Sequence, residues 1–158
     1  MRSLSVAVLL ALSTTACVPD EGPSMRPGED CLSCHDGDRG PKWSVAGTVF
    51  GDPQAAATGG VLAAQVLITD ATGRNLTLTT NEVGNFYTAE DLTFPIRVEV
   101  QKDGKRMAMS DSPPVGSCNY CHSPQPPEGE DDVPGRLFVP DSTATASVAH
   151  PRPQASYK

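Results

Sequence analysis

AQVLITDATGRNLTLTT, residues 64–80, is the stretch that decides the fold class of this chain. Ala64, Val66 and Ile68 alternate with Gln65, Leu67 and Thr69, and leucine alternates with threonine through 76–79. Alternation with a period of two is typical of a strand with one face on a core and the other toward water. The turn residues at 70–73 separate the two runs, so the stretch predicts two short strands.

The same pattern continues on both sides of this stretch. Ile96, Val98 and Val100 alternate with polar side chains through residue 101, and a β-rich run covers 45–50. Further turn signals lie at 58–60 and 81–85, and no long helix is predicted. Short strands at this spacing predict a mostly β chain, a small antiparallel sandwich flanked by two loop-rich segments.

Residues 47–88, which begin GTVFGDPQ and pass through GGVLAAQVLITDATGRNLTLTTNEVGNFYT, resemble the carboxypeptidase-regulatory-like sandwich domains. The resemblance rests on a G-x-V start, a D-x-x-G turn and a T-N-x-x-G-x-F hairpin. It implies a seven-stranded transthyretin-like or immunoglobulin-like sandwich. Such domains commonly serve as spacers or docking modules, so the resemblance carries little information on function.

Composition limits the function further. The chain has 158 residues with only 5% aromatics, so its core is modest. Small domains of this kind commonly depend on disulfides, metals or covalent cofactors. The formal net charge of -7 argues against nucleic-acid binding, which needs a basic face. It suits an acidic surface that docks a basic partner, and solubility alone also explains it.

The first sixteen residues indicate export. Arg2 precedes an apolar run at 3–12 that is too short to span a bilayer, and small residues lead to Cys17. This arrangement resembles the cleavage site of bacterial lipoproteins, although Thr14 stands where that family usually has leucine. The resemblance implies lipidation of Cys17, and Val18 after it favours the outer membrane, facing the periplasm or the surface. An ordinary secretion signal is the alternative.

The motif C-x-x-C-H occurs twice, as Cys31-Leu32-Ser33-Cys34-His35 and as Cys118-Asn119-Tyr120-Cys121-His122. Two cysteines three positions apart can add across the two vinyl groups of one haem, and the next histidine can then ligate the iron. Two such motifs behind an export signal predict two covalently attached c-type haems.

Three alternatives use the same cysteines without haem. The four motif cysteines can form a zinc site of two C-x-x-C knuckles, although that requires no histidine after each knuckle. They can form two disulfides, as secreted chains favour. A C-x-x-C redox pair is the third alternative, but the βαβ context of thioredoxin is absent.

The number of histidines in the chain limits which residues can be the sixth ligands of the two irons. The chain has three histidines, and His35 and His122 are expected proximal ligands, so histidine fills at most three of four axial positions. Met109, nine residues before Cys118, and His150 are the candidates for the remaining positions. Met107 and Met25 are further candidates, and methionine is also a common core residue.

The predicted order is a signal at 1–16, a tether at 17–30, a first haem segment at 31–43, a sandwich at 44–110, a second haem segment at 111–140 and a flexible tail at 141–158. The flanks PKWSVAGTV and MSDSPPVGSCNYCH, with PGRL at 134–137, resemble exported cytochromes that carry a sandwich between haem motifs.

That resemblance implies an electron carrier rather than an enzyme, with other cytochromes or redox proteins as partners. A haem with an open sixth site, as in a peroxidase or gas sensor, is the second hypothesis. A non-haem sandwich that acts as a binding module, with zinc or disulfide staples, is the third.

Overall fold

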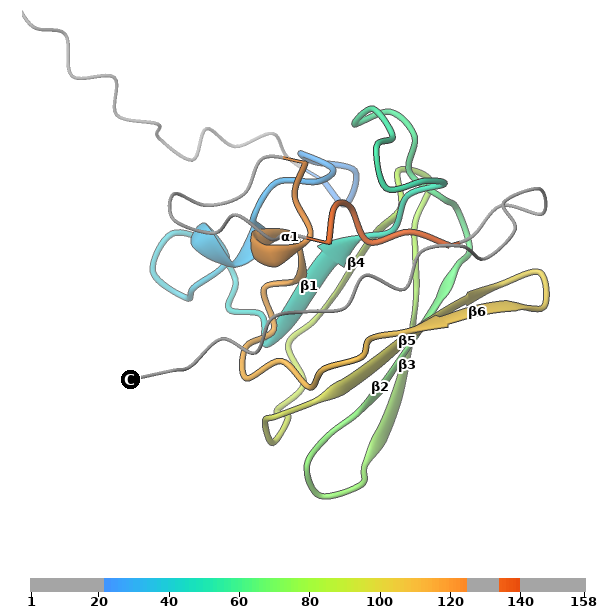
Figure 1. Cartoon of the computed structure of the whole chain (residues 1–158). Helices are drawn as coiled ribbons and strands as arrows, with labels where there is room; N and C mark the ends of the chain where they lie inside the picture. The colour runs from blue at the N-terminus through green and yellow to red at the C-terminus, as the bar shows by residue number, and fades with distance from the viewer. Residues whose placement is uncertain (1–21, 125–133, 140–158) are drawn as a thin grey trace, which may run out of the picture.

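The computed structural model describes residues 22–124 and 134–139 (Figure 1). The fold is mostly β and contains two antiparallel sheets, which confirms the predicted small sandwich. The larger sheet has the order β3-β2-β5-β6, with β2 at Gln65–Thr69, β3 at Asn75–Thr79, β5 at Arg97–Lys102 and β6 at Lys105–Ala108. The smaller sheet pairs β1, Val45–Thr48, with β4, Asn85–Thr88.

The alternation seen in the sequence decides which side chains face the core. Val66 of β2 pairs with Leu78 of β3 on one side and with Val100 of β5 on the other, so apolar residues stack across the sheet. In β2 and β5 every second side chain is buried. In β3 the leucines are only half-buried, because this strand forms an edge of the sheet.

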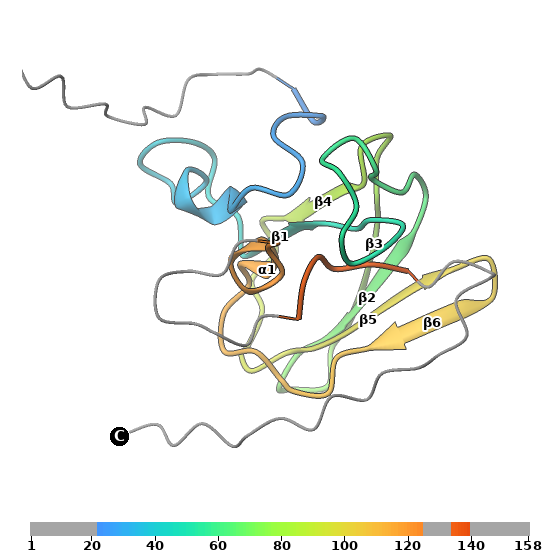
Figure 2. The same cartoon turned by 45° about the horizontal axis from the view of Figure 1, so that its top comes forward.

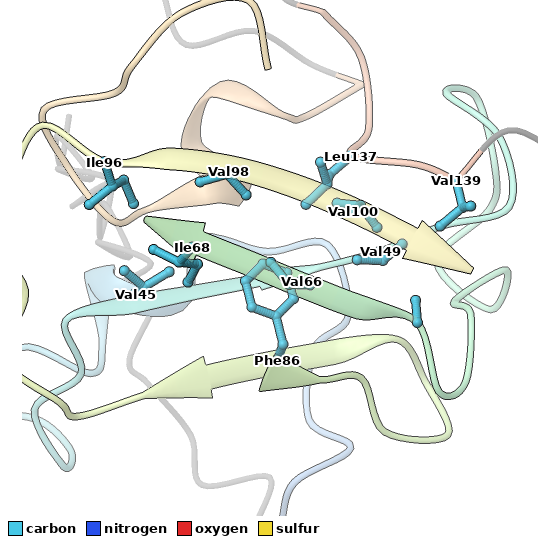
Figure 3. Packing of buried hydrophobic residues seen from close by; sticks show 11 residues of the cluster. Val45, Val49, Val66, Ile68, Phe86, Ile96, Val98, Val100, Leu137 and Val139 are labelled. Carbon is cyan, nitrogen blue, oxygen red and sulfur yellow. The ribbon is translucent and has the colours of Figure 1, made fainter. Parts of the chain in front are cut away.

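The core lies between the two sheets, where side chains of both face each other (Figure 3). Phe86 of β4 and Val45 of β1 pack against the buried valines and isoleucine of the larger sheet. Leu137 and Val139 belong to the same cluster although they follow the second motif in the chain. The sandwich core therefore includes residues from outside the predicted range of 44–110.

Chain segments around the second motif extend the smaller sheet beyond β1. The amide of Ala46 donates to the carbonyl of Gly116 at 3.0 Å, and the amide of Phe50 donates to that of Leu137 at 2.8 Å. Residues from both sides of the second motif thus pair with β1 and its continuation, as isolated parallel bridges. Residues 28 and 119 also contact Thr48 on the face away from the core, and every residue from 45 to 50 is buried.

The segment before the second motif comes closest to β1 at Gly116. A Cβ atom there would lie 1.9 Å from the carbonyl oxygen of Ser44 and 2.9 Å from the Cα of Val45. Because both obstacles are backbone, we expect Gly116→Ala to lower the free energy of unfolding by about 1–3 kcal/mol or more, measured by urea titration. Gly51→Ala is the control, since nothing lies within 4 Å of its Cβ position. Equal stability of the two variants would show that segment 116–118 does not pack on β1.

Residues 22–30, part of the predicted tether, lie against the sandwich. The side-chain amide of Asn85 donates to the carbonyl of Met25 at 2.8 Å, and the amide of Gly28 donates to the hydroxyl of Thr48 at 2.9 Å. These bonds bring the chain to the start of the first motif along the smaller sheet. Within the described ranges, no helix has the length and apolar character needed to cross a membrane.

Candidate functional site

Both C-x-x-C-H motifs form a short helical turn, and the two turns lie side by side at one end of the sandwich (Figure 2). The first is η1, Cys31–Ser33, and the second is α1, Cys118–Cys121. In each, the amide of the histidine donates to the carbonyl of the first cysteine at 2.9 Å. Residues three apart on a helical turn lie on the same face, so each turn brings its two cysteine positions together.

Direct contacts join the two motifs just before their first cysteines. Asp30 caps η1, because its carboxylate accepts the amide of Leu32 at 3.1 Å. The same carboxylate oxygen accepts the hydroxyl of Ser117, the residue before α1. Asn119 inside the second motif donates to the carbonyl of Glu29 at 2.8 Å. The two motifs are thus hydrogen-bonded neighbours although they are far apart in sequence.

The thiols of Cys31 and Cys118 are held in their neutral form. Burial raises the pKa of Cys31 to about 11, with the charge of Asp30 adding to the effect. Burial raises the pKa of Cys118 to about 12, with Cys31 and Cys121 contributing. Reactive C-x-x-C redox pairs have a lowered thiol pKa instead. These two thiols therefore do not have the electrostatics of a thioredoxin-like centre.

Nδ1 of each motif histidine lies against a backbone carbonyl oxygen. Nδ1 of His35 lies 3.2 Å from the carbonyl oxygen of Pro41, and Nδ1 of His122 lies 3.0 Å from that of Gly135. The contact is a hydrogen bond when Nδ1 carries the proton, and that tautomer leaves the lone pair on Nε2. A backbone carbonyl on one ring nitrogen is a common way to orient a histidine that ligates a metal through the other.

Aromatic stacking adds to the orientation of His35. Its ring lies 3.5 Å from that of Trp43 with an interplanar angle of 9°, and Trp43 stacks on Tyr87 at 4.1 Å and 10°. Asp36 supports the intervening loop by accepting the amides of Asp38 and Arg39. The first histidine is thus fixed by a ring stack and by its backbone contact.

Apolar surface is concentrated at this end of the molecule. Among the described residues, four large hydrophobic side chains are exposed. Tyr120 belongs to the second motif, Val115 lies three residues before it, and Tyr87 ends the ring stack on His35. Only Leu62 lies elsewhere. Exposed apolar groups that gather around one site commonly contact a ligand or a partner.

The cysteines differ in their covalent state. Cys34 is disulfide-bonded, whereas Cys31, Cys118 and Cys121 are not in disulfides. The alternative of two disulfides among the four motif cysteines is therefore not formed. Across 22–124 and 134–139, no three His, Cys, Asp or Glu side chains gather as a metal-binding group.

The candidate sixth ligands are less well placed by the structure. Met109 packs against the hydrophobic cluster, and its amide donates to the carbonyl of Val98 at 3.0 Å. Met107 lies on β6 opposite Val100. His150 and the predicted lipidation site Cys17 lie outside the described residues. Ligation by Met109 or His150 and lipidation of Cys17 stay predictions.

Sequence reasoning missed the polar residues that connect the motifs. Asn119 belongs to the segment GSCNYCH, which resembles exported cytochromes, but no contact was predicted for it, and it is 3% exposed and fully hydrogen-bonded. Asp30 and Ser117 also have no sequence pattern that pairs them. The asparagine in that segment was the available signal, but the sequence indicates no partner for it.

No protein-family model, curated protein or solved structure matches this chain.

Proposed function

We propose that this protein is a dihaem c-type cytochrome that transfers single electrons in the cell envelope. The observation that carries the proposal is the repeated arrangement at one end of the sandwich. Each C-x-x-C-H motif forms one helical turn, and each motif histidine has Nδ1 against a backbone carbonyl. A structural cysteine knuckle requires neither the second histidine nor this shared orientation.

The residues present fit a covalently attached haem. Cys31 and Cys34, and separately Cys118 and Cys121, supply two sulfur atoms at the i, i+3 spacing that two thioethers need. His35 and His122 supply Nε2 as the proximal ligand, and the exposed apolar side chains around the motifs suit a large apolar ring. When bound, haem supplies an iron that alternates between the ferric and ferrous states.

The protein's own part is orientation and environment. The carbonyls of Pro41 and Gly135 set the rotation of the two imidazoles and raise their basicity as ligands. The stack of Trp43 and Tyr87 restrains His35 further. Rigidly held ligands would keep the structural reorganisation around the iron small when its oxidation state changes.

The proposed partners are other cytochromes or redox proteins, and the proposed location is the envelope, through an export signal and a lipid anchor at Cys17.

The chain has too few histidines to supply two to each of two haems. At least one iron would therefore take methionine, water or another ligand at its sixth position. Met109 remains the proposed sulfur ligand, although its packing against the core means that it must turn outward to reach an iron.

A spectrum of the purified chain tests the proposal. The full-length protein is produced in a host with haem-attachment machinery, and its absorbance is recorded oxidised and reduced. We expect a Soret band, sharpened α and β bands on reduction, and a mass for the denatured protein that includes two haems. A protein that lacks a Soret band and carries zinc or only disulfides would reject the proposal.

One observation favours a second function. The disulfide at Cys34 is incompatible with a thioether at the same sulfur, and it suits a stapled binding module. Haem attachment requires that this bond be reduced first. Mass spectrometry of the motif peptides distinguishes the two functions, because a haem-linked Cys34 and a disulfide-linked Cys34 differ in mass and in sensitivity to reductant.

A further inference from the structure

Asn119 lies at the point where the two motifs and β1 meet. Its Oδ1 accepts the amide of Thr48 at 3.0 Å, and its Nδ2 donates to the carbonyl of Glu29 at 2.8 Å and to the hydroxyl of Thr48 at 3.1 Å. One side chain thus bonds the second motif to the segment that enters the first motif and to the strand between them.

The hydrogen-bond network around Asn119 is buried and continues into the sandwich. The hydroxyl of Thr48 accepts the amide of Gly28 at 2.9 Å and donates to Asn85 at 2.8 Å, and both Thr48 and Asn119 are almost fully buried. Buried polar networks whose members are all satisfied fix one arrangement of the groups they join, because any shift leaves a donor or acceptor unpaired. The network therefore sets the position of α1 relative to η1.

We propose that Asn119 is a positioning residue that fixes the separation and relative orientation of the two haems. The inference rests on the proposed function, since each haem is attached to one of the two turns that Asn119 joins. The Ser117–Asp30 contact is a second link between the same turns, at a part-buried position. Without Asn119, the carbonyl of Glu29 and the amide of Thr48 lose their partner, and of these links only the part-buried Ser117–Asp30 contact still joins the two turns.

The test is the circular dichroism of the Soret band, because two haems held close in a fixed orientation give a two-signed couplet. The full-length holoprotein and its Asn119→Leu variant are compared at equal haem content, measured as the pyridine haemochrome. Leucine matches the shape of asparagine but forms no hydrogen bond. We expect the wild type to show the couplet and the variant to lose most of it while retaining both haems.

Two further variants keep the test decisive. Thr80→Val removes a buried hydroxyl that bonds only within the sandwich, to Ala64 and Val61, and should leave the couplet unchanged. Asn119→Asp keeps the oxygen that accepts the amide of Thr48 but loses the side-chain amide that donates to Glu29, and it should also weaken the couplet. This variant serves as the test if Asn119→Leu does not fold.

The outcomes separate the inference from the function. A wild type without haem rejects the proposed function. A wild type with two haems and no couplet overturns the inference alone, as does an undiminished couplet in Asn119→Leu. If that variant does not fold, an undiminished couplet in Asn119→Asp overturns it instead. An equal loss in Thr80→Val also overturns it, because the couplet would then follow general stability.

Discussion

Serine at both Cys118 and Cys121 is expected to remove one of the two covalent haems and to leave the other in place. The reason is that each haem forms its two thioethers within a single motif, and serine oxygen does not add to the vinyl groups. The measurement is the mass of the denatured protein together with its haem stain. The Soret absorbance per chain should fall to about half of the wild-type value, because one of the two proposed chromophores is lost.

The reciprocal variant and a control complete this experiment. Serine at Cys31 and Cys34 should remove the other haem, and the four-serine variant should carry none. Cys17→Ser removes the fifth cysteine of the chain, which belongs to neither motif, and should retain both haems. Complete loss of haem from either double variant would show that attachment is not independent at the two motifs. An unchanged haem content would show that the motifs are not the attachment sites.

Phe50→Ala is expected to lower the free energy of unfolding by about 3–5 kcal/mol, the usual cost of removing a buried phenylalanine ring. Phe50 is 0% exposed, and the guanidinium of Arg136 lies over its ring at 4.1 Å. Truncation leaves a cavity and also removes the cation–π partner of a buried charge. The total stability of a domain is about 5–15 kcal/mol, so a large fraction is lost.

Urea unfolding followed by far-ultraviolet circular dichroism measures this loss as a lower midpoint at an unchanged slope. Leu62→Ala is the control, since Leu62 is 58% exposed and its truncation should change stability by about 0.5 kcal/mol or less. If the two variants unfold at the same midpoint, Phe50 does not belong to the tightly packed part of the molecule. A changed slope would instead indicate that the unfolding is not two-state.

The strands of the larger sheet could be predicted because their pattern is local. Val66 and Ile68 of β2, and Val98 and Val100 of β5, are buried at every second position, as alternation requires. The β1 region could not be understood in the same way. Its side chains are buried on both faces because residues 28 and 119 contact the face away from the core, and segments from beyond residue 115 also pair with its free edge. No local pattern reports such partners.

The candidate site was predictable to a similar degree. The motifs identify Cys31, Cys118 and the two histidines directly, since their chemistry depends on residues adjacent in sequence. The carbonyl of Gly135 and the side chain of Asn119 reach their partners only through the fold. The docking of residues 22–30 was also missed, because proline and glycine there predict a linker whether or not it is bound elsewhere.

The contacts that join the two turns are among the most non-local in the molecule, which has a consequence for the order of folding. Asn119 is separated from Thr48 by 71 positions and from Glu29 by 90, and Ser117 from Asp30 by 87. The β2–β3 and β5–β6 hairpins, by contrast, close over a few residues. Because loop-closure entropy delays distant contacts, the hairpins are expected to form while both C-x-x-C-H segments are still open. On the proposed function, an enzyme that attaches haem would then meet the two cysteine pairs on segments that have not yet joined, and their joining would be a late step of folding.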